Sequence, residues 1–296
     1  MKKFILITGG SGNLGTSIVK KLCGEQFKIL SRTPRPTAIY GDTSLIDWGL
    51  ETELEGLIKQ TTKVIHCAGL TSPFASIAKH YAVNTQSVEV LSRFLECGVP
   101  VDHISTLSVF AESNISRGSI TSPTQCHPEP DLSNLAGLRY HGNYAKSKVA
   151  AEKYLVANSQ KFNAQLRIIR PSLVIGNSNH EFINQFNMGL SKLTAVPETL
   201  PEKEINFITT EEMARKYLEI HYSVSTDPIQ VVHTCSNNQT LHAYLSSFKH
   251  EPSTKNFLRD ISKLSRVQRA LILTALTNET KNSPFEMFKS TGLKYA

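Results

Sequence analysis

A tyrosine and a lysine spaced four residues apart are the side chains in this sequence best suited to proton chemistry. Tyr144 and Lys148 stand at the start of a segment with a helical pattern. Residues with this spacing share one helix face, so the Lys148 ammonium would lie beside the Tyr144 phenol and lower a pKa that is normally about 10. A phenol tuned in this way can donate or accept a proton at neutral pH. The same spacing also occurs on ordinary surface helices, so its place in the chain matters.

A hydroxyl group at the end of a predicted strand adds to this pair. The apolar run His103–Leu107 is typical of a buried strand. Thr106 would then place its hydroxyl at the carboxyl edge of the sheet, where ligands of such folds bind. The sequence therefore predicts Thr106, Tyr144 and Lys148 as a catalytic set that moves a proton while a hydride is transferred.

A glycine-rich turn directly follows the first predicted strand and opens the first predicted helix. Glycines at positions 9, 12 and 15 allow a tight turn, close approach of backbone N–H groups to a pyrophosphate and close packing of the helix on the strand. An ordinary βα turn is the alternative interpretation. The pattern predicts a dinucleotide site whose contacts in this turn are Gly9, Ser11, Gly12, Asn13 and Leu14.

The residue after the second predicted strand bears on the kind of dinucleotide. NAD-binding proteins usually carry an acidic residue there, about 20 residues after the glycines, which binds the ribose 2′-hydroxyl. This sequence has Ser31-Arg32 instead. An arginine can bind a 2′-phosphate through two hydrogen bonds, so Arg32 favours NADP (as NADPH) over NAD. A solvated surface arginine is the alternative.

Alternating strand and helix patterns predict the elements that position these residues. The fold class is α/β, a Rossmann-type doubly wound parallel sheet with a smaller, mostly helical C-terminal substrate-binding part. The expected strands are Phe4–Thr8, Phe27–Leu30, Lys63–Cys67, His103–Leu107, Leu166–Val174 and Ile229–Thr234. The expected helices are Leu14–Leu22, Ala75–Cys97, Tyr144–Asn158, Thr209–His221 and Asn256–Leu276, and Ser113–His141 is expected to be a long loop.

These elements suggest a division of the chain. Residues 1–175 would form the NADP-binding domain, completed by about 207–236, and 176–206 with 237–296 would bind the substrate. The apolar run after Met1-Lys2-Lys3 is too short for a signal peptide, and no run is long enough for a membrane span, so a cytoplasmic location is expected.

Composition narrows the possible partners. The five cysteines are scattered and the ten histidines lack ligand spacing, so no metal site is predicted. The net charge of +7 and the pI of about 9.1 suit an anionic cofactor or an acidic protein partner. No motif of a nucleic-acid reader is present, so binding to nucleic acid is not expected.

The motifs together resemble the extended short-chain dehydrogenase/reductase family over most of the chain. The glycine turn and the Thr106, Tyr144 and Lys148 set match the family's nucleotide-binding and catalytic motifs. The resemblance implies further cofactor contacts at Asp42 and Thr43 after the third strand, at Cys67, Ala68 and Gly69 after the fourth, at Asn84 in the central helix, and at Pro171 in Arg170-Pro171. It also implies that Lys148 contacts the nicotinamide ribose.

Within that family, three segments are most similar to the thioester reductases of nonribosomal peptide and polyketide assembly lines. They are Ile104–Phe110, the long stretch between Thr106 and Tyr144, and Gly142–Lys148 followed by Ala151-Glu152. The resemblance implies an acyl thioester substrate on a carrier protein, reduced by NADPH to an aldehyde. A short stretch from Arg32 to Gly41 departs from the pattern. The alternatives are an enzyme for a free small molecule, such as a nucleotide sugar or a ketone or alcohol, and a non-catalytic NADP sensor.

A charge pattern near the C-terminus suggests where a carrier protein would dock. At about 100° per residue, the predicted helix Asn256–Leu276 separates an apolar face from a basic one. The apolar face holds Phe257, Ile261, Leu264, Val267 and Leu271, and the basic stripe holds Lys255, Arg259, Lys263, Arg266 and Arg269. An acidic carrier protein is predicted to dock near Arg259, Lys263 and Arg266; a solvated helix face with a chance basic bias is the alternative.

Overall fold

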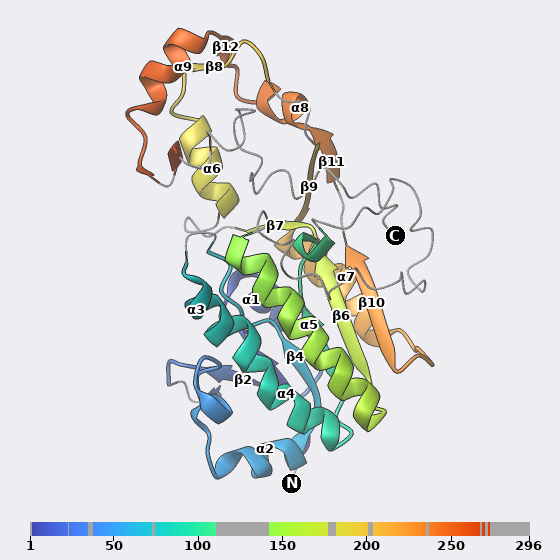
Figure 1. The fold of residues 1–296 in the computed structure, drawn as a ribbon. Coiled ribbons are helices and arrows are strands. Elements are labelled where there is room, and N and C mark those ends of the chain that lie inside the picture. The colour runs from blue at the N-terminus through green and yellow to red at the C-terminus, as the bar shows by residue number, and fades with distance from the viewer. Residues whose placement is uncertain are drawn as a thin grey trace.

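The chain folds into a sheet domain and a smaller second unit that extends from one end of it (Figure 1). The computed structural model describes residues 2–22, 24–34, 38–72, 75–110, 142–176, 182–200, 204–234, 237–266, 268–269 and 272. The predicted loop Ser113–His141 lies outside these residues.

In the described residues, the sheet domain contains a seven-stranded parallel sheet in the order β10-β6-β5-β4-β1-β2-β3. Its strands are β1 (Phe4–Thr8), β2 (Phe27–Ser31), β3 (Ala38–Tyr40), β4 (Thr61–His66), β5 (Val101–Ile104), β6 (Leu166–Pro171) and β10 (Ile229–Thr234). The strand order reverses between β1 and β4. In sheets of this kind, ligands bind outside the carboxyl ends of the strands at such a reversal, and this region is called the crevice below. The Rossmann-type sheet predicted from the sequence is confirmed.

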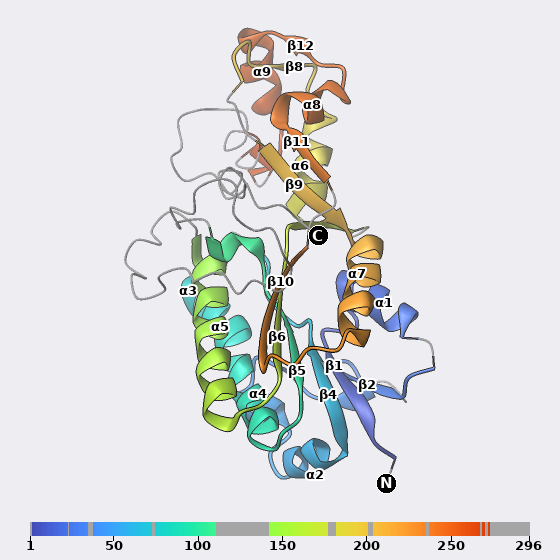
Figure 2. The same cartoon turned by 90° about the vertical axis from the view of Figure 1, so that its right-hand side faces the viewer.

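Helices cover both faces of this sheet (Figure 2). One face carries α1 (Asn13–Lys21) and α7 (Thr210–Tyr222), and the other carries α2 (Glu53–Gln60), α4 (Ser87–Glu96) and α5 (Gly142–Phe162). Every residue of β1 is buried because both of its faces are covered. The carboxyl ends of the strands point toward the second unit, since β1 runs away from the N-terminus at the opposite end (Figure 2).

The second unit combines short helices with two small sheets that the sequence did not predict. Its elements are β7 (Leu173–Ile175), α6 (Phe182–Leu190), β8 (Ala195–Val196), β9 (Glu204–Thr209), β11 (Asn237–Thr240), α8 (Leu241–Ser246), β12 (Glu251–Pro252) and α9 (Thr254–Ile261). The sheets have the orders β11-β9-β7 and β12-β8. Phe186, Leu190, Phe257 and Ile261 belong to a separate core inside this unit.

Four predicted strands have different bounds in the structure. The differences are small for β2, which ends at Ser31 and not at Leu30, and for β4, which is Thr61–His66 and not Lys63–Cys67. They are larger for the other two strands. The expected strand His103–Leu107 is wrong at both ends, because β5 starts at Val101 and already includes Asp102, whose charge is satisfied by buried partners. The expected strand Leu166–Val174 is divided at Ser172 into β6 and β7. The Ser172 N–H donates to the Thr234 carbonyl, after which the chain enters the other sheet.

The predicted continuous helix Asn256–Leu276 is also wrong. Helix α9 ends at Ile261, and a turn separates it from helical positions that begin at Arg266. The Arg269 guanidinium donates to carbonyl groups at the end of α9 and in the turn, and the Ser265 hydroxyl accepts from the Gln268 N–H. These side-chain caps replace the hydrogen bonds that a continuous helix would make. Val267, Leu271 and Leu276 of the prediction lie outside the described residues or side chains.

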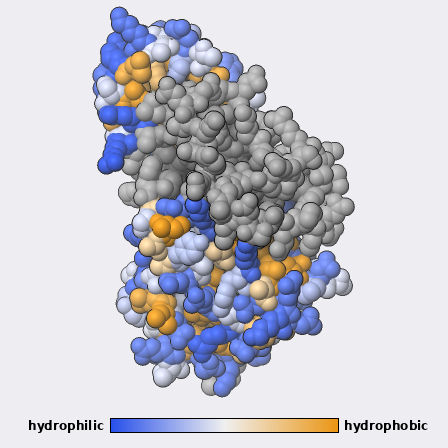
Figure 3. Space-filling model, in the orientation of Figure 1, coloured by the Kyte–Doolittle hydropathy of each residue, from blue (hydrophilic) through white to orange (hydrophobic). Residues whose placement is uncertain are grey.

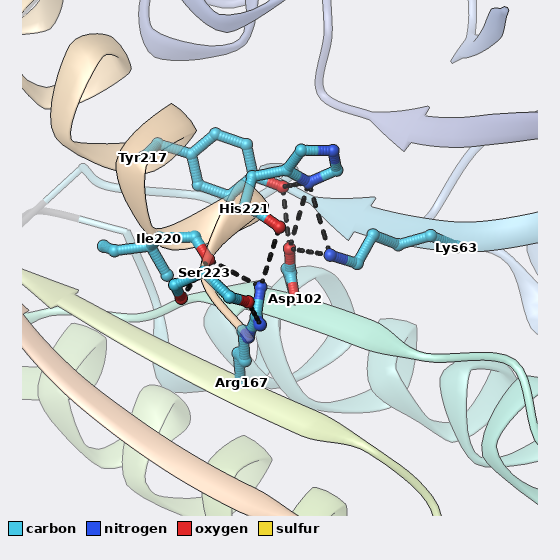
Figure 4. Close-up of polar contacts among 7 residues, drawn as sticks. All are labelled: Lys63, Asp102, Arg167, Tyr217, Ile220, His221 and Ser223. Carbon is cyan, nitrogen blue, oxygen red and sulfur yellow. Dashed lines mark hydrogen bonds and ion pairs between the residues drawn. The ribbon is translucent and has the colours of Figure 1, made fainter. Parts of the chain in front are cut away.

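A buried ionic cluster fastens α7 to the sheet (Figure 4). Asp102 of β5 lies 3.1 Å from the Lys63 ammonium of β4 and accepts a 2.8 Å hydrogen bond from the Tyr217 hydroxyl of α7. His221 Nδ1 lies 3.8 Å from the same carboxylate. Arg167 of β6 donates to the carbonyls at the end of α7, which caps that helix. The cluster is near the amino ends of the strands, away from the crevice between β1 and β4.

No helix within the described part of the chain is long and apolar enough to cross a membrane. The face in Figure 3 is mainly hydrophilic over the sheet domain, and its apolar residues form separate areas. Scattered apolar residues of this kind are normal on protein surfaces.

Candidate functional site

The glycine turn after β1 has the shape that a pyrophosphate requires. Gly9 has a φ of +69°, and a Cβ there would lie 2.5 Å from the Ala68 nitrogen. A Cβ on Gly15 would lie 2.1 Å from the Gly9 carbonyl oxygen, so helix α1 packs too closely for any side chain. Gly12 caps α1 without a side chain, and the first turn of this helix, at Asn13, holds no acidic residue. The Gly12 N–H donates to the Gly9 carbonyl at 3.0 Å and closes the turn. The turn therefore directs the N-terminus of α1 toward the position that an anion would occupy in dinucleotide binding.

The ends of β2 and β3 lie side by side at the far side of the crevice. Ser31 pairs with Tyr40, and the Gly41 N–H donates to the Ser31 carbonyl, so Arg32 and Asp42 follow neighbouring strands. Arg32 is exposed, whereas Asp42 and Thr43 are half-buried. Asp42 already accepts hydrogen bonds from the N–H and hydroxyl of Ser44, at 2.9 and 2.8 Å. This order allows Arg32 to meet a 2′-phosphate while the Asp42 segment lines the adenine side.

His66, which the sequence analysis placed only within the predicted strand Lys63–Cys67, connects β1 to β4 beneath the crevice. His66 Nδ1 and the Thr8 hydroxyl are 2.8 Å apart, and Thr8 also accepts from the Ala68 N–H. The His66 ring stacks on the indole of Trp48. Burial, together with the Lys148 charge, lowers the pKa of His66 to about 3. A neutral ring thus holds the two strands together at the point where their connections diverge.

Asn84 anchors the segment that follows β4. It lies in a π-helical turn, η2 (Tyr81–Gln86), between α3 (Ile77–His80) and α4, where the sequence predicts one continuous helix. Its amide accepts from the Leu70 N–H at 2.7 Å and donates to the Leu70 carbonyl and to the Ser147 hydroxyl. Turns of this type are frequent at functional sites because they redirect a side chain. Asn84 links the loop after β4 to helix α5.

Cys67, Ala68 and Gly69 form that loop, directly next to the predicted catalytic lysine. A Cβ on Gly69 would lie 3.3 Å from Asn84 Oδ1 and 3.4 Å from Lys148 Nζ. Burial raises the pKa of the Cys67 thiol to about 12, against the opposing charge of Lys148. The loop therefore offers uncharged backbone and side chains to a ligand beside Lys148.

The three residues predicted to be catalytic converge at the carboxyl edge of the sheet. Tyr144 of α5 makes a side-chain hydrogen bond with Thr106, which follows β5. Lys148, one turn further along α5, is buried and donates a 2.9 Å hydrogen bond to the Ile104 carbonyl. Pro171 ends β6, the next strand in the sheet. A donor pair and a cation thus lie together beside the loop after β4.

The electrostatics of this pair differ from the sequence-based expectation. Burial raises the pKa of Tyr144 to about 12, and the hydrogen bond with Thr106 offsets this only in part. Burial lowers the pKa of Lys148 to about 8, although the Glu152 carboxylate opposes that shift. The expectation that Lys148 lowers the Tyr144 pKa is wrong for this structure, because desolvation dominates and the Lys148 ammonium is directed to a backbone carbonyl. A phenol that stays protonated suits a general acid.

A buried ionic group behind these residues was missed as part of the site. Glu152 of α5 pairs with Arg170 of β6 at 2.5 Å and accepts from the Ser105 hydroxyl. The sequence could have indicated Glu152, because Tyr144, Lys148 and Glu152 follow one another at intervals of four residues. They therefore share one helix face. No metal-binding group of acidic, histidine or cysteine side chains occurs among the described residues.

The fold and the site define a nucleotide-binding α/β protein with a tyrosine–lysine pair at the switch point of its sheet. Residues 24–216 match the family described as Male sterility protein (NAD_binding_4). The chain therefore belongs to this NAD-binding family of extended short-chain dehydrogenases/reductases, which are oxidoreductases and epimerases. The family match begins after the glycine turn. The assignment of this turn to pyrophosphate binding therefore depends on the geometry of Gly9 and Gly15.

Several characterised proteins are similar in sequence. The UDP-glucose 4-epimerase of Vibrio cholerae is 26% identical over 88% of this chain and 76% of its own length. The PKS-NRPS hybrid synthetase psoA of Aspergillus fumigatus is 25% identical over 71% of this chain, which spans only 6% of that protein. The sterol-4-alpha-carboxylate 3-dehydrogenase (decarboxylating) of Dictyostelium discoideum is 31% identical over 60% of this chain and 55% of its own length.

Solved structures share the fold. The terminal R domain of the myxalamid PKS-NRPS biosynthetic pathway matches with a TM-score of 0.71 and 17% identity, over 93% of this chain and 80% of that one. A thiolation-reductase di-domain from an archaeal non-ribosomal peptide synthetase matches with a TM-score of 0.69 and 17% identity, over 97% and 70%. MoeE5 in complex with UDP-glucuronic acid and NAD matches with a TM-score of 0.62 and 18% identity, over 83% and 81%.

Proposed function

We propose that this chain is an NADPH-dependent reductase that converts a carrier-protein-bound acyl thioester to an aldehyde. The observation that carries the proposal is the hydrogen-bonded pair of Thr106 and Tyr144, held next to Lys148 at the carboxyl edge of the sheet. Such a pair can hold the oxygen of a carbonyl group while negative charge develops on it. The likeness to reductase domains of peptide and polyketide assembly lines favours a thioester carbonyl.

The geometry of the site supports the following assignment of the cofactor contacts. The turn Gly9–Leu14 would bind the pyrophosphate, Arg32 the 2′-phosphate, and Asp42 with Thr43 the adenine side. Cys67, Ala68, Gly69 and Pro171 would line the nicotinamide side, with Asn84 fixing the loop. When bound there, NADPH supplies the hydride. In this proposal, the cofactor is bound by residues 1–175 together with about 207–236. The substrate is bound by residues 176–206 and 237–296.

The protein's own side chains would carry the rest of the reaction. Thr106 and Tyr144 donate hydrogen bonds to the thioester oxygen as the hydride reaches the carbonyl carbon, and Tyr144 gives its proton to that oxygen. The product is a hemithioacetal, whose carbon–sulfur bond then breaks. The sulfur leaves as the thiol of the carrier arm, and the hydroxyl becomes the carbonyl of the aldehyde. Lys148 stays protonated and binds the nicotinamide ribose.

A second candidate is an enzyme that acts on a free small molecule, such as a nucleotide sugar or a ketone or alcohol. The observation that favours it is the similarity to the Vibrio cholerae UDP-glucose 4-epimerase, which extends over 88% of this chain. The same tyrosine, lysine and threonine could serve that chemistry. A cytoplasmic location belongs to either proposal.

Product analysis by mass spectrometry discriminates between the candidates. The purified protein is incubated with NADPH and a panel of acyl-pantetheine thioesters, and separately with UDP-sugars and ketones. Appearance of aldehyde and free pantetheine thiol, with one NADPH consumed per thioester, is the expected result. Turnover of UDP-sugars or ketones without any turnover of thioesters would contradict the first proposal and support the second.

A further inference from the structure

Three buried side chains join the elements that carry the site. Glu152 of α5 accepts from Arg170 Nε at 3.1 and 3.2 Å, and from the Arg170 terminal nitrogen at 2.5 Å. Ser105 donates its hydroxyl hydrogen to the same carboxylate. All three residues are at most 5% exposed. Helix α5 is thus tied to the ends of two adjacent strands, β5 and β6, through a single carboxylate.

Each member of this group is next to a residue of the proposed site. Ser105 precedes Thr106, and Arg170 precedes Pro171. Glu152 follows Lys148 by four residues on the same face of α5. A shift of the Glu152 carboxylate would therefore move three parts of the proposed site. They are the Thr106 hydroxyl, the Lys148 ammonium and Pro171 at the end of β6.

Stability alone is a poor explanation for an ion pair in this place. The cost of removing two charges from water is comparable to the attraction between them, so a buried pair adds little net stability compared with apolar side chains. A second buried ion pair in the protein allows a comparison. Asp102 and Lys63 form a similar cluster, but it lies near the amino ends of the strands and on the α7 face of the sheet (Figure 4). The Asp102 cluster attaches helix α7 to the sheet. The Glu152 group instead contacts the carboxyl ends of β5 and β6, next to the proposed site.

We propose that Glu152 is a positioning residue, which holds Thr106, Lys148 and Pro171 in register and keeps Lys148 in its ammonium form. The inference rests on the proposed function, because it concerns how the same site binds its dinucleotide. Glu152 touches neither cofactor nor substrate in this scheme and acts through the residues that do.

The groups around Lys148 support the electrostatic part of this role. Glu152 raises the Lys148 pKa against the larger effect of burial. Among the described residues, the ionisable groups near Lys148 on or just after β4, on β5 and on α5 are Cys67, His66, His103, Tyr144 and Glu152. Burial favours the neutral form of the first four, since it raises the pKa of the thiol and the phenol and lowers that of both imidazoles. The Glu152 carboxylate is then the anion that supports the ammonium.

The test is the pH dependence of NADPH binding, which needs no substrate. The dissociation constant is measured by titration between pH 6.5 and 9.5 for the wild type, Glu152→Gln, Glu152→Asp and the matched control Asp102→Asn. Wild-type binding should weaken as the pH rises through about 8, where Lys148 loses its proton. In Glu152→Gln this midpoint should move down by about one pH unit, with roughly fivefold weaker binding at pH 8.

The other variants separate positioning from folding. Glu152→Asp keeps the negative charge, but its side chain is one methylene shorter and the carboxylate lies farther from Lys148. The midpoint of its pH dependence should therefore lie between those of the wild type and Glu152→Gln. It also serves as the deciding variant if Glu152→Gln does not fold. Asp102→Asn should lose thermal stability while its midpoint stays at the wild-type value. An unmoved midpoint in a folded Glu152 variant would overturn the inference and leave the proposed function standing. A wild type that binds no NADPH would overturn both.

Discussion

Arg32 illustrates how one side chain can select between two closely related cofactors. It follows β2, next to the half-buried Asp42 segment, and it is exposed to any group on the adenosine ribose. The guanidinium can bind a 2′-phosphate through two charge-assisted hydrogen bonds but gains little from a neutral 2′-hydroxyl. In the proposed function, the preference for NADP over NAD would depend on this difference.

We expect NADPH to bind at least about tenfold more tightly than NADH, a difference of roughly 1.4 kcal/mol. Arg32→Ala should remove this preference, whereas the exposed Lys59→Ala on α2 should keep it. Both dissociation constants are measured by fluorescence titration at fixed ionic strength. Equal wild-type constants, or an unchanged preference in Arg32→Ala, would show that Arg32 does not bind the 2′-phosphate.

Tyr144 carries the second prediction about a single side chain. Because its phenol has a pKa of about 12 and is hydrogen-bonded to Thr106, it is protonated at neutral pH and suited to act as the acid. Tyr144→Phe should leave NADPH binding intact and lower kcat by roughly 10²–10⁴-fold. Steady-state kinetics with the substrate found in the product panel give kcat, and titration gives the binding control. Near-normal turnover in this variant would mean that another group donates the proton.

The attachment of α7 to the sheet depends on a carboxylate in the interior. Burial alone would raise the pKa of Asp102, but His221, Lys63 and Tyr217 together lower it below its usual value. A carboxyl with a depressed pKa in the folded state stabilises the protein above the unfolded pKa of about 3.9, and this contribution is lost as the pH falls through the folded value. The cluster should therefore make folding sensitive to acid.

We expect Asp102→Asn to lower the free energy of unfolding by about 3 kcal/mol at pH 7, because it leaves Lys63 without its buried partner. The difference between variant and wild type should shrink as the pH falls below about 4. Urea denaturation at pH 7, 5 and 3 measures both effects. The exposed Asp227→Asn is the matched control and should behave as the wild type. A difference that stays constant down to pH 3 would contradict the assignment.

Helix α9, which carries Lys255 and Arg259 of the predicted basic stripe, lies at the end of the molecule remote from the N-terminus (Figure 1). Because the helix ends at Ile261, Arg266 and Arg269 do not continue one helical stripe with them. Arg259 and Lys263 each approach the buried Asp260 at 3.3 Å, and Arg269 caps α9, so these three residues have structural partners. Hydrogen bonds from Thr194, aided by Lys263 and Arg259, lower the pKa of Asp260. Lys255 and Arg266 are exposed, and neither forms an ion pair with another described residue. Substitutions at these two positions therefore test carrier docking without breaking an ion pair of the described structure.

Replacing Lys255 and Arg266 by Glu should lower kcat/KM for a carrier-bound thioester by about tenfold, and leave kcat/KM for the free pantetheine thioester unchanged. The reason is that charge steers the encounter with an acidic protein. The effect should decline between 0.05 and about 1 M salt, where the Debye length falls to about 3 Å. Lys2→Glu with Lys3→Glu makes the same charge change at the opposite end and should have no effect. Equal losses with both substrates would mean that the stripe is only a solvated surface.

Local patterns in the sequence were sufficient for the parts of this protein whose structure depends on neighbouring residues. The β1–turn–α1 unit follows from an apolar run and from glycines that only a tight turn requires, and β10 has the predicted bounds. The face shared by Tyr144 and Lys148 follows from helical periodicity alone. The predicted parallel, doubly wound sheet follows from the alternation of such segments along the chain.

Contacts that the local patterns do not show decided the rest. Asp102 enters β5 because Lys63 and Tyr217, 39 and 115 positions away, satisfy its charge, and no local pattern shows this. Helix α9 stops at Ile261 because Arg269 caps its end, although the amphipathic period continues. The pKa of Tyr144 rises because folding removes water from its phenol, whereas spacing predicts only that Lys148 is near. Desolvation and long-range pairing depend on the packed interior, so the tertiary structure alone sets them.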